Sequence, residues 1–259
     1  MSVSAPARGS FWSERKVAWY RRANARSDYA DLVLRAAEPL LAACRSALDV
    51  GAGFGALAVP LARRLGQVTA LEPAPAMAAA LREEATRAGL PGLRVIAAAW
   101  GELPLEPHDA VVCAHVGPLL GRGAPFLAAA RSLARRGVVI VRDVPGDDKF
   151  FYRELYPRLL GRPYDGGCGA DDTLAALAAL GLTPTVTPIV YDSGQPFDSL
   201  EEACDFWMTY MELEGAAPRA YLRGFLAERL TREGSGWLAP FHKQAAVIQW
   251  LTAEKEDAP

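Results

Sequence analysis

Short apolar runs alternate with segments of helical periodicity along most of the chain. The runs lie at residues 47–50, 68–71, 93–97, 109–114 and 137–143, with further strands expected at 183–191 and 244–251. Continuous apolar runs of strand length, separated by helices, are typical of a mainly parallel sheet covered on both faces. The pattern therefore predicts an α/β fold with a doubly wound, mainly parallel, seven-stranded sheet.

Two features refine this pattern. Pro184 and Pro188 lack the N–H that a central strand donates, so the strand at 183–191 is expected at a sheet edge or strand end. Near the N-terminus, Trp12, Lys16 and Trp19 are spaced for one face of a further helix. Other helices are expected at about 56–65, 74–89, 125–136 and 171–180, and across 198–233 in two pieces.

Composition and charge exclude several classes of protein. The 28 basic and 30 acidic residues give a net charge of −2, which disfavours a protein that depends on phosphate contacts, so a nucleic-acid partner is not expected. No apolar run approaches the roughly 20 residues that span a bilayer, so no membrane partner is expected. The four cysteines, at positions 44, 113, 168 and 204, lack paired spacing, so neither a metal site nor a disulfide framework is predicted. Reduced thiols in a cytoplasmic protein are the expectation.

A glycine-rich turn between the first strand and the next helix carries the candidate chemistry. Gly51, Gly53 and Gly55 alternate in a G-x-G-x-G pattern, which differs from the G-x-G-x-x-G loop of dinucleotide sites. Asp49 precedes the loop, where a carboxylate repels a pyrophosphate and attracts an ammonium group. Glu72 ends the second strand, where a carboxylate can accept hydrogen bonds from ribose hydroxyls. A ligand with an ammonium group, a ribose and no phosphate fits both positions, as S-adenosylmethionine does.

The two motifs together resemble those of class I S-adenosylmethionine-dependent methyltransferases. They read Asp49-Val50-Gly51-Ala52-Gly53-Phe54-Gly55 and Leu71-Glu72-Pro73. The resemblance covers residues 45–145 well and the rest more loosely, and it implies a Rossmann-like sheet whose seventh strand is antiparallel. It implies S-adenosyl-L-methionine as cofactor, with these expected binding residues: Asp49, Gly51, Ala52, Gly53, Gly55, Glu72, Pro73, Met77, Trp100 and Tyr20.

Some of these positions have a second interpretation. Trp100 is expected to cover the adenine, or else to pack on a helix as an ordinary loop residue. Met77 either touches the adenine or belongs to the core. At Ala99 the family often has an acidic residue that contacts the adenine amino group, so that contact is missing here or comes from elsewhere. Tyr20 is expected to hydrogen-bond the cofactor carboxylate from a covering N-terminal helix, whose alternative is a solvated amphipathic helix.

The acceptor side of the site is less well defined. His115 follows the fourth strand, where the family places the methionine part of the cofactor and the acceptor. It is a candidate catalytic base, a cofactor contact or a substrate contact, and its alternative is a structural histidine. Asp143 ends the fifth strand and either orients an acceptor or caps a turn. The aromatic segments further along suggest Tyr152, Trp207 and Tyr210 as substrate residues, although most such residues pack helices.

Methyl transfer from a sulfonium is an in-line displacement that depends on alignment and exclusion of water. We therefore expect a small-molecule methyltransferase of one domain, 1–259. Its parts are a covering helix at 1–30, a cofactor half at 45–145, substrate-side insertions and helices at 146–236, and the final strand and tail at 237–259. The alternatives are RNA or protein methylation, a cofactor-binding module without catalysis, or an NAD-dependent enzyme, which Asp49 disfavours. The acceptor and the oligomeric state are not predicted.

Overall fold

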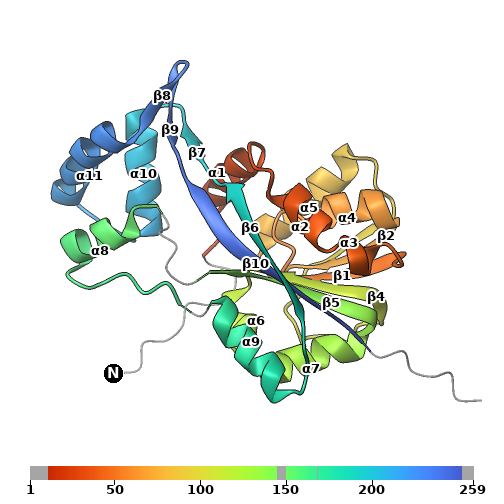
Figure 1. Ribbon diagram of the computed structural model, residues 1–259. Helices are drawn as coiled ribbons and strands as arrows, with labels where there is room; N and C mark the ends of the chain where they lie inside the picture. The colour runs from red at the N-terminus through yellow and green to blue at the C-terminus, as the bar shows by residue number, and fades with distance from the viewer. Residues whose placement is uncertain (1–10, 145–149, 168, 253–259) are drawn as a thin grey trace, which may run out of the picture.

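The computed structural model describes residues 11–144, 150–167 and 169–252 and is built on one seven-stranded sheet (Figure 1). Its strand order is β3-β2-β1-β4-β5-β10-β6. The strands are β1 Ser46–Val50, β2 Gln67–Leu71, β3 Leu93–Ile96, β4 His108–Ala114, β5 Ala134–Asp143, β6 Thr185–Asp192 and β10 His242–Leu251. β10 pairs antiparallel with β5 and β6, and the strand pairs from β3 to β5 are parallel. The predicted seven-stranded fold is confirmed.

Helices cover both faces of this sheet (Figure 1). One face carries α2 Tyr29–Ala36, α3 Glu38–Leu41, α4 Ala58–Leu65 and α5 Pro75–Arg87; the other carries α6 Gly117–Leu120, α7 Ala124–Leu133 and α9 Ala170–Ala179. Neighbouring strand residues alternate between the two resulting cores. Val111 packs with the second group and Val112 with the first. This period of two, with apolar residues on both sides, explains why the strands read as continuous apolar runs.

The edge strand β6 agrees with its prolines. It pairs only with β10 in this sheet, and Pro188 lies opposite Ala246. A proline N cannot donate to a ladder, and at an edge one side of the strand needs no donor. β6 ends the sheet as the sequence predicts.

The second part of the chain forms an aromatic lobe beside the sheet, which we define as α8, β7, α10, α11, β8 and β9. These are α8 Tyr152–Leu160, β7 Gln195–Phe197, α10 Leu200–Tyr210, α11 Ala216–Arg229, β8 Thr231–Glu233 and β9 Gly236–Ala239. The three strands form a small antiparallel sheet of their own, in the order β7-β9-β8. Sequence analysis did not predict it, since strands of three or four residues are too short to show a period.

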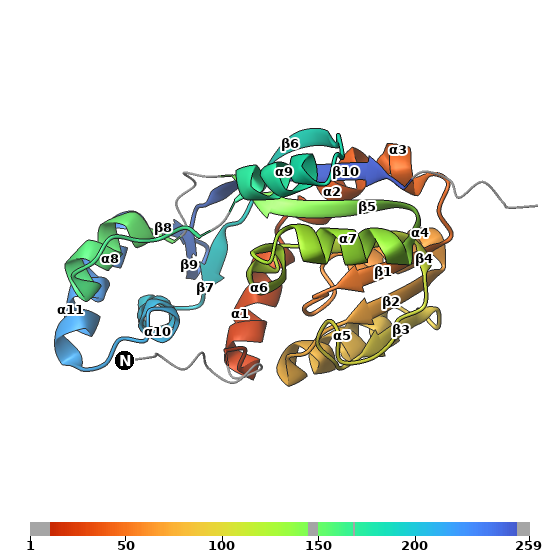
Figure 2. The same ribbon diagram turned by 90° about the horizontal axis from the view of Figure 1, so that it is seen from below.

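Helix α1, Glu14–Asn24, lies between the lobe and the main sheet, with α10 on one side and α5 on the other (Figure 2). Ion pairs fasten it on both sides. Arg21 pairs with Glu83 of α5 at 3.1 Å, and Arg22 pairs with Glu202 of α10. Because its buried face carries Val17 and Trp19, α1 joins two hydrophobic clusters.

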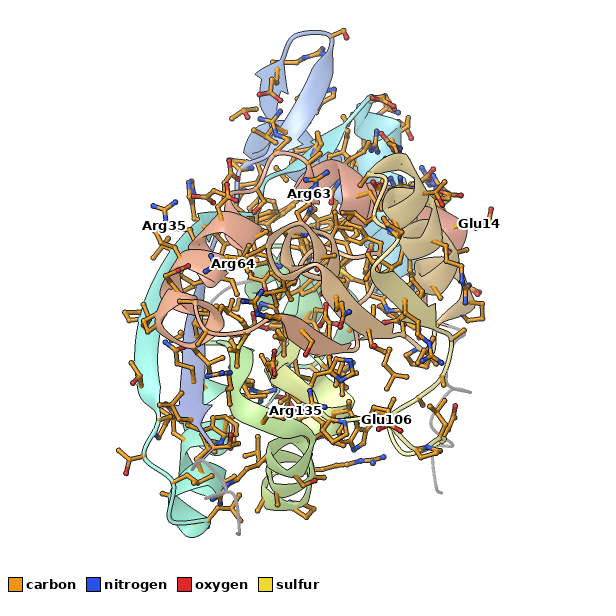
Figure 3. The ribbon with its side chains drawn as sticks, turned by 90° about the vertical axis from the view of Figure 1, so that its right-hand side faces the viewer. Glu14, Arg35, Arg63, Arg64, Glu106 and Arg135 are labelled. Carbon is orange, nitrogen blue, oxygen red and sulfur yellow. The ribbon has the colours of Figure 1, made fainter. Side chains whose placement is uncertain are left out.

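The outer surface carries charges of both signs. Figure 3 shows Arg35, Arg63 and Arg64 around the helices of the first face, and Arg135 beside the sheet. Arg64 donates to Glu38 at 2.7 Å. In the described part of the chain, no helix is both long and apolar enough to cross a bilayer. Over the same residues, no group of three or more His, Cys, Asp or Glu side chains is arranged to hold a metal ion.

Candidate cofactor site and its neighbours

The glycine loop turns sharply between β1 and α4. Gly51 and Gly55 have φ angles of 74° and 101°, in the left-handed region that favours glycine. A Cβ on Gly51 would lie 2.3 Å from Val116 Cγ2, and one on Gly55 would lie 2.4 Å from Leu81 Cδ1. These two glycines therefore let the loop pack against Val116, which follows β4, and against α5, while residues 51–53 line the cavity.

Glu72 fastens this loop. Its Oε2 accepts a hydrogen bond from Gly53 N at 2.8 Å, and its Oε1 accepts one from Ala74 N at 2.8 Å. Burial raises the pKa of Glu72, and these two backbone hydrogen bonds act in the opposite direction. The carboxylate thus sets the shape of the loop and keeps lone pairs for further donors.

Asp49 is the most unusual ionisable group at this edge of the sheet. Its side chain is 2% exposed, and its Oδ2 is buried without a hydrogen-bond partner. Burial raises the pKa of Asp49 to about 7, with a further contribution from the nearby Glu72 charge. A buried carboxylate with an unpaired oxygen is costly unless a donor or a cation joins it. The site is therefore electrostatically incomplete and suited to a positively charged group.

Both carboxylates face a cavity of about 400 Å³ at the carboxyl ends of the central strands. Ligands of open α/β sheets collect at this edge. The lining includes nine of the ten residues expected to bind a cofactor: Asp49, Gly51, Ala52, Gly53, Glu72, Pro73, Met77, Trp100 and Tyr20. Gly55 is the exception, because it lies one turn further on, against Leu81 and Val59. Sequence positions from 20 to 100 are thus brought to one surface.

The N-terminal helix supplies one wall of the cavity. Tyr20 stacks on Trp12, with ring centroids 5.8 Å apart, and meets the edge of Phe54 at 4.9 Å. Tyr20 as a whole residue is 37% exposed, but desolvation at its hydroxyl raises the pKa of Tyr20 to about 12, and the charge of Asp143 adds to the shift. Tyr20 is therefore a neutral donor at neutral pH, placed between the glycine loop and the end of β5.

Trp100 and Ala99 form another wall. Trp100 packs edge-on against Phe126 with centroids 5.1 Å apart, and it also lines the cavity. Ala99 N donates to Glu102 Oε2 at 2.8 Å. Glu102 is not among the cavity residues, so the acidic group expected by the family pattern does not reach the cavity from this turn. Met77 is 1% exposed and belongs at once to the cavity wall and to the core around Phe54.

The ends of β4 and β5 bring the two acceptor-side candidates together. His115 Nδ1 lies 3.1 Å from Asp143 Oδ1, with the two side chains 22% and 27% exposed. His115 lines the cavity, and its backbone φ of 55° is left-handed.

The structure does not bring the three aromatic substrate candidates to this cavity. Tyr152, Trp207 and Tyr210 belong to the hydrophobic cluster of the aromatic lobe, and none lines the cavity. Trp207 is fully buried, and its Nε1 donates to Phe150 O at 2.7 Å. Trp207 and Tyr210 of α10 pack against the rings of Phe150 and Phe151, which precede α8, and Tyr152 packs against its own neighbours. The sequence pattern alone does not distinguish such ring-on-ring packing from a pocket.

Tyr29 is a polar cavity residue that the sequence did not indicate. Tyr29, at the start of α2, is 6% exposed and its hydroxyl is buried without a partner. Its ring lies 5.5 Å from that of His115 and 4.8 Å from that of Tyr191. Burial raises the pKa of Tyr29 well above its usual range. Position 29 looks like an ordinary buried helix residue in sequence, so no local signal marks it.

Comparison with known proteins supports this location of the site. Residues 47–137 match the family model described as a methyltransferase domain. This segment contains the glycine loop, Glu72, Trp100 and His115. A search of the curated proteins finds no match to the sequence.

Solved structures share the fold at low sequence identity. An S-adenosylmethionine-dependent methyltransferase from Geobacter sulfurreducens, solved with S-adenosyl-L-homocysteine, has TM-score 0.53 and 15% identity, with 85% of this chain and 90% of that chain covered. The YcgJ protein of Bacillus subtilis has TM-score 0.53 and 16% identity, with 86% and 97% covered. A protein described as a sarcosine dimethylglycine methyltransferase, from Galdieria sulphuraria, has TM-score 0.50 and 16% identity, with 87% and 86% covered. At these identities the likeness shows the fold alone.

Proposed function

We propose that this chain, which belongs to the class I S-adenosylmethionine-dependent methyltransferases, transfers the methyl group of S-adenosyl-L-methionine to a small-molecule acceptor by in-line displacement. The single observation that carries the placement of the cofactor is Asp49. Asp49 lines the cavity beside a second carboxylate, and its Oδ2 is buried without a partner, so a cationic ligand at this end of the cavity lowers the cost of burying the charge.

The residues present fit this cofactor. The backbone of the glycine loop lines the cavity, where a ligand can approach it closely. Glu72 keeps lone pairs that can accept hydrogen bonds from hydroxyl groups, and Trp100 presents an aromatic ring at the cavity wall. Bound S-adenosylmethionine supplies a methyl group already activated by its sulfonium charge. The work left to the chain is to hold the ligands in line and to keep water out.

A small acceptor is supported by the wall that α1 forms over the cavity. Trp12 and Tyr20 stack there, and ion pairs hold α1 to both α5 and α10. A covering helix fastened on both sides suits an acceptor that enters an enclosed space better than a nucleic acid or a protein surface. The three described cysteines are buried free thiols, so we also propose a cytoplasmic location.

Cofactor binding is tested by calorimetric titration of the full chain with S-adenosylmethionine and, separately, with NAD. We expect heat with the first ligand and none with the second. Absence of heat with S-adenosylmethionine at tens of micromolar protein would overturn the proposal. Heat with NAD alone would assign the cavity to a dinucleotide.

The acceptor class is tested by transfer of a labelled methyl group into a cell extract that is then separated into metabolite, RNA and protein fractions. We expect label in the metabolite fraction. Label confined to RNA or to protein would replace the small-molecule assignment, and binding without label in any fraction would indicate a cofactor-binding module without catalysis.

A further inference from the structure

His115 and Asp143 meet because β4 and β5 are parallel neighbours that end at the same edge of the sheet. Ala114 lies opposite Val141 in the register, so the residues that follow emerge side by side. His115 Nδ1 lies 3.1 Å from Asp143 Oδ1, within ion-pair distance but without the alignment of a hydrogen bond. This leaves the other ring nitrogen, Nε2, for a different partner.

The backbone at His115 is held in an unusual conformation. Its φ of 55° is left-handed, and its N–H donates to Val141 O at 3.0 Å. A non-glycine residue in this region costs of the order of 1–3 kcal/mol and persists where the surroundings enforce it, often at functional sites. The Tyr29 ring, 5.5 Å away, further restricts the imidazole.

The second nitrogen of His115 has no partner in the described part of the protein. Nε2 is buried from bulk water and has no hydrogen-bond partner, although the residue lines the cavity. An imidazole with one nitrogen beside a carboxylate and the other unpaired has the arrangement of a general base oriented by an acid. In ligand-free structures such bases are often imperfectly aligned and tighten only around the reactants.

We propose, resting on the methyl-transfer function above, that His115 is the general base and Asp143 its positioning residue. Asp143 accepts the Nδ1–H of His115 and so fixes the tautomer in which Nε2 carries a lone pair. The acceptor oxygen forms its bond to the methyl carbon while the carbon–sulfur bond breaks and its electron pair goes to sulfur. The acceptor proton passes to Nε2, and the Asp143 carboxylate stabilises the resulting imidazolium.

This pair fits an acceptor that must lose a proton, and together with the aromatic walls of the cavity it favours a planar one with an acidic hydroxyl, such as a phenol or an enol. Carboxylates are already ionised near neutral pH and need no base. An aliphatic amine is protonated near neutral pH and must lose a proton as a phenol must, so the choice between these two acceptors rests on the shape of the cavity and not on the base. A phenolic hydroxyl has a pKa near 10 and is a weak nucleophile until its proton leaves. The aromatic walls formed by Trp12, Tyr20 and Tyr29 suit a planar acceptor.

The tautomer is tested without any acceptor by ¹⁵N NMR of the full chain labelled at histidine, with S-adenosyl-L-homocysteine as the added probe. The His115 signals are assigned by their loss in His115→Asn, since asparagine tolerates a left-handed backbone better than most residues. We expect a protonated Nδ1 and an unprotonated Nε2. Asp143→Asn places an amide N–H opposite Nδ1 and is expected to reverse or mix the tautomers, whereas Asp31→Asn, at an exposed position of α2, leaves them unchanged.

Two NMR outcomes overturn the pair. One is His115 signals that do not respond to Asp143→Asn. The other is signals that respond to Tyr29→Phe instead, which would show that Nε2 pairs with the Tyr29 hydroxyl. Because this arm does not depend on turnover, it reports on the pair even if the chain fails to transfer methyl groups.

The role of His115 as the base is tested by steady-state kinetics with the acceptor that the labelled-methyl screen identifies. His115→Asn is expected to lower kcat by roughly 10²–10⁴-fold with the Kd for S-adenosylmethionine within threefold of wild type. Added imidazole is expected to restore part of the activity of His115→Gly, and His242→Asn, at an exposed histidine, to retain full activity. A kcat of His115→Asn within fivefold of wild type, or methylation of a carboxylate or thiol, would overturn the proposal while leaving the cofactor function intact.

Discussion

The cavity edge of the sheet and the aromatic lobe use similar residue types in opposite ways. In the lobe, Phe206 and Trp207 are almost completely buried, ring lies on ring, and Trp207 Nε1 has a backbone partner. At the cavity, Tyr29, His115 and Asp49 each bury a polar atom that has no partner. A few further such atoms, among them Thr173 Oγ1 and Trp250 Nε1, lie away from the cavity. Among the described residues, none of the unpartnered buried side-chain atoms belongs to the lobe's core cluster.

This difference separates burial that stabilises the fold from burial that awaits a ligand. An aromatic side chain whose polar atom is satisfied contributes through its buried area and ring contacts. A buried polar atom without a partner lowers stability by about 1–3 kcal/mol, and where its residue lines a cavity a bound ligand can supply the missing partner. The two regions should therefore respond to mutation in opposite ways, one in stability and the other in affinity.

The largest expected effect is on the lobe. Trp207→Ala removes a fully buried ring and is expected to lower the free energy of unfolding by about 3–5 kcal/mol. The Kd for S-adenosylmethionine, measured well below the unfolding temperature, should change little, because Trp207 does not line the cavity. Denaturant unfolding and calorimetry check the two parts. Trp100→Ala is the matched control: it should weaken binding more and stability less, since Trp100 is only half-buried. The reverse ranking would contradict the comparison.

The sequence predicts the sheet better than the lobe for a physical reason. Strands buried on both faces leave continuous apolar runs such as 109–114, which became β4 with one residue added. The prediction from Pro188 that its strand lies at a sheet edge is also confirmed, because β6 is the last strand of the sheet. The lobe's strands β7 and β8 have three residues each, and their pairing depends on chain neighbours far apart in sequence.

The site residues also differ in how far the sequence predicts them. Those set by a local motif are predicted, and those set by the packing of distant segments are not. Asp49 and Glu72 could be predicted because a local motif fixes where a strand ends and what its last side chain faces. Tyr29 could not, since its place in the cavity depends on α2 packing beside the end of β4. Trp207 and Tyr210 were candidates for the substrate side on aromatic character, a property that core and pocket share.

The next effect is on affinity. Asp49→Asn removes the buried charge and is expected to weaken binding of S-adenosylmethionine by roughly 1–3 kcal/mol, without loss of stability in the free protein. Asp109→Asn is the matched control. Asp109 accepts hydrogen bonds from Arg45 N and Ser46 N, so its replacement should lower stability and leave affinity unchanged. Calorimetry and thermal unfolding of both variants measure this. Equal affinities in wild type and Asp49→Asn would show that Asp49 does not hold the cofactor.

The pH dependence of binding follows from the raised pKa of Asp49, about 7 against 3.8 in a free side chain. Between these values the folded free protein binds more protons than the unfolded chain, so its stability falls as pH rises through this window. Binding of the cationic cofactor favours the ionised carboxylate. The affinity of the protein for S-adenosylmethionine should therefore rise roughly tenfold per pH unit as the pH increases towards 7. The α-amino group of the cofactor stays protonated over this range. Titrations from pH 5.5 to 7 should show this slope in wild type and a much flatter one in Asp49→Asn. A flat wild-type profile would exclude a titrating Asp49.

The smallest effect concerns α1, the element that joins the two regions. Arg22 pairs with Asp198 at 3.1 Å and with Glu202, so Arg22→Ala loosens α1 from the lobe while its bond to α5 through Arg21 remains. Partly exposed ion pairs contribute about 0–1 kcal/mol each, so the Kd for S-adenosylmethionine should rise less than about fivefold, through a less fixed Trp12 and Tyr20. Arg229→Ala, which breaks the 2.7 Å pair with Glu154 inside the lobe, should cost similar stability and leave the Kd unchanged. Because salt screens such pairs, the difference between the two variants should shrink in 0.5 M salt. If both variants change affinity equally, α1 does not couple the lobe to the cavity, and the two regions are independent.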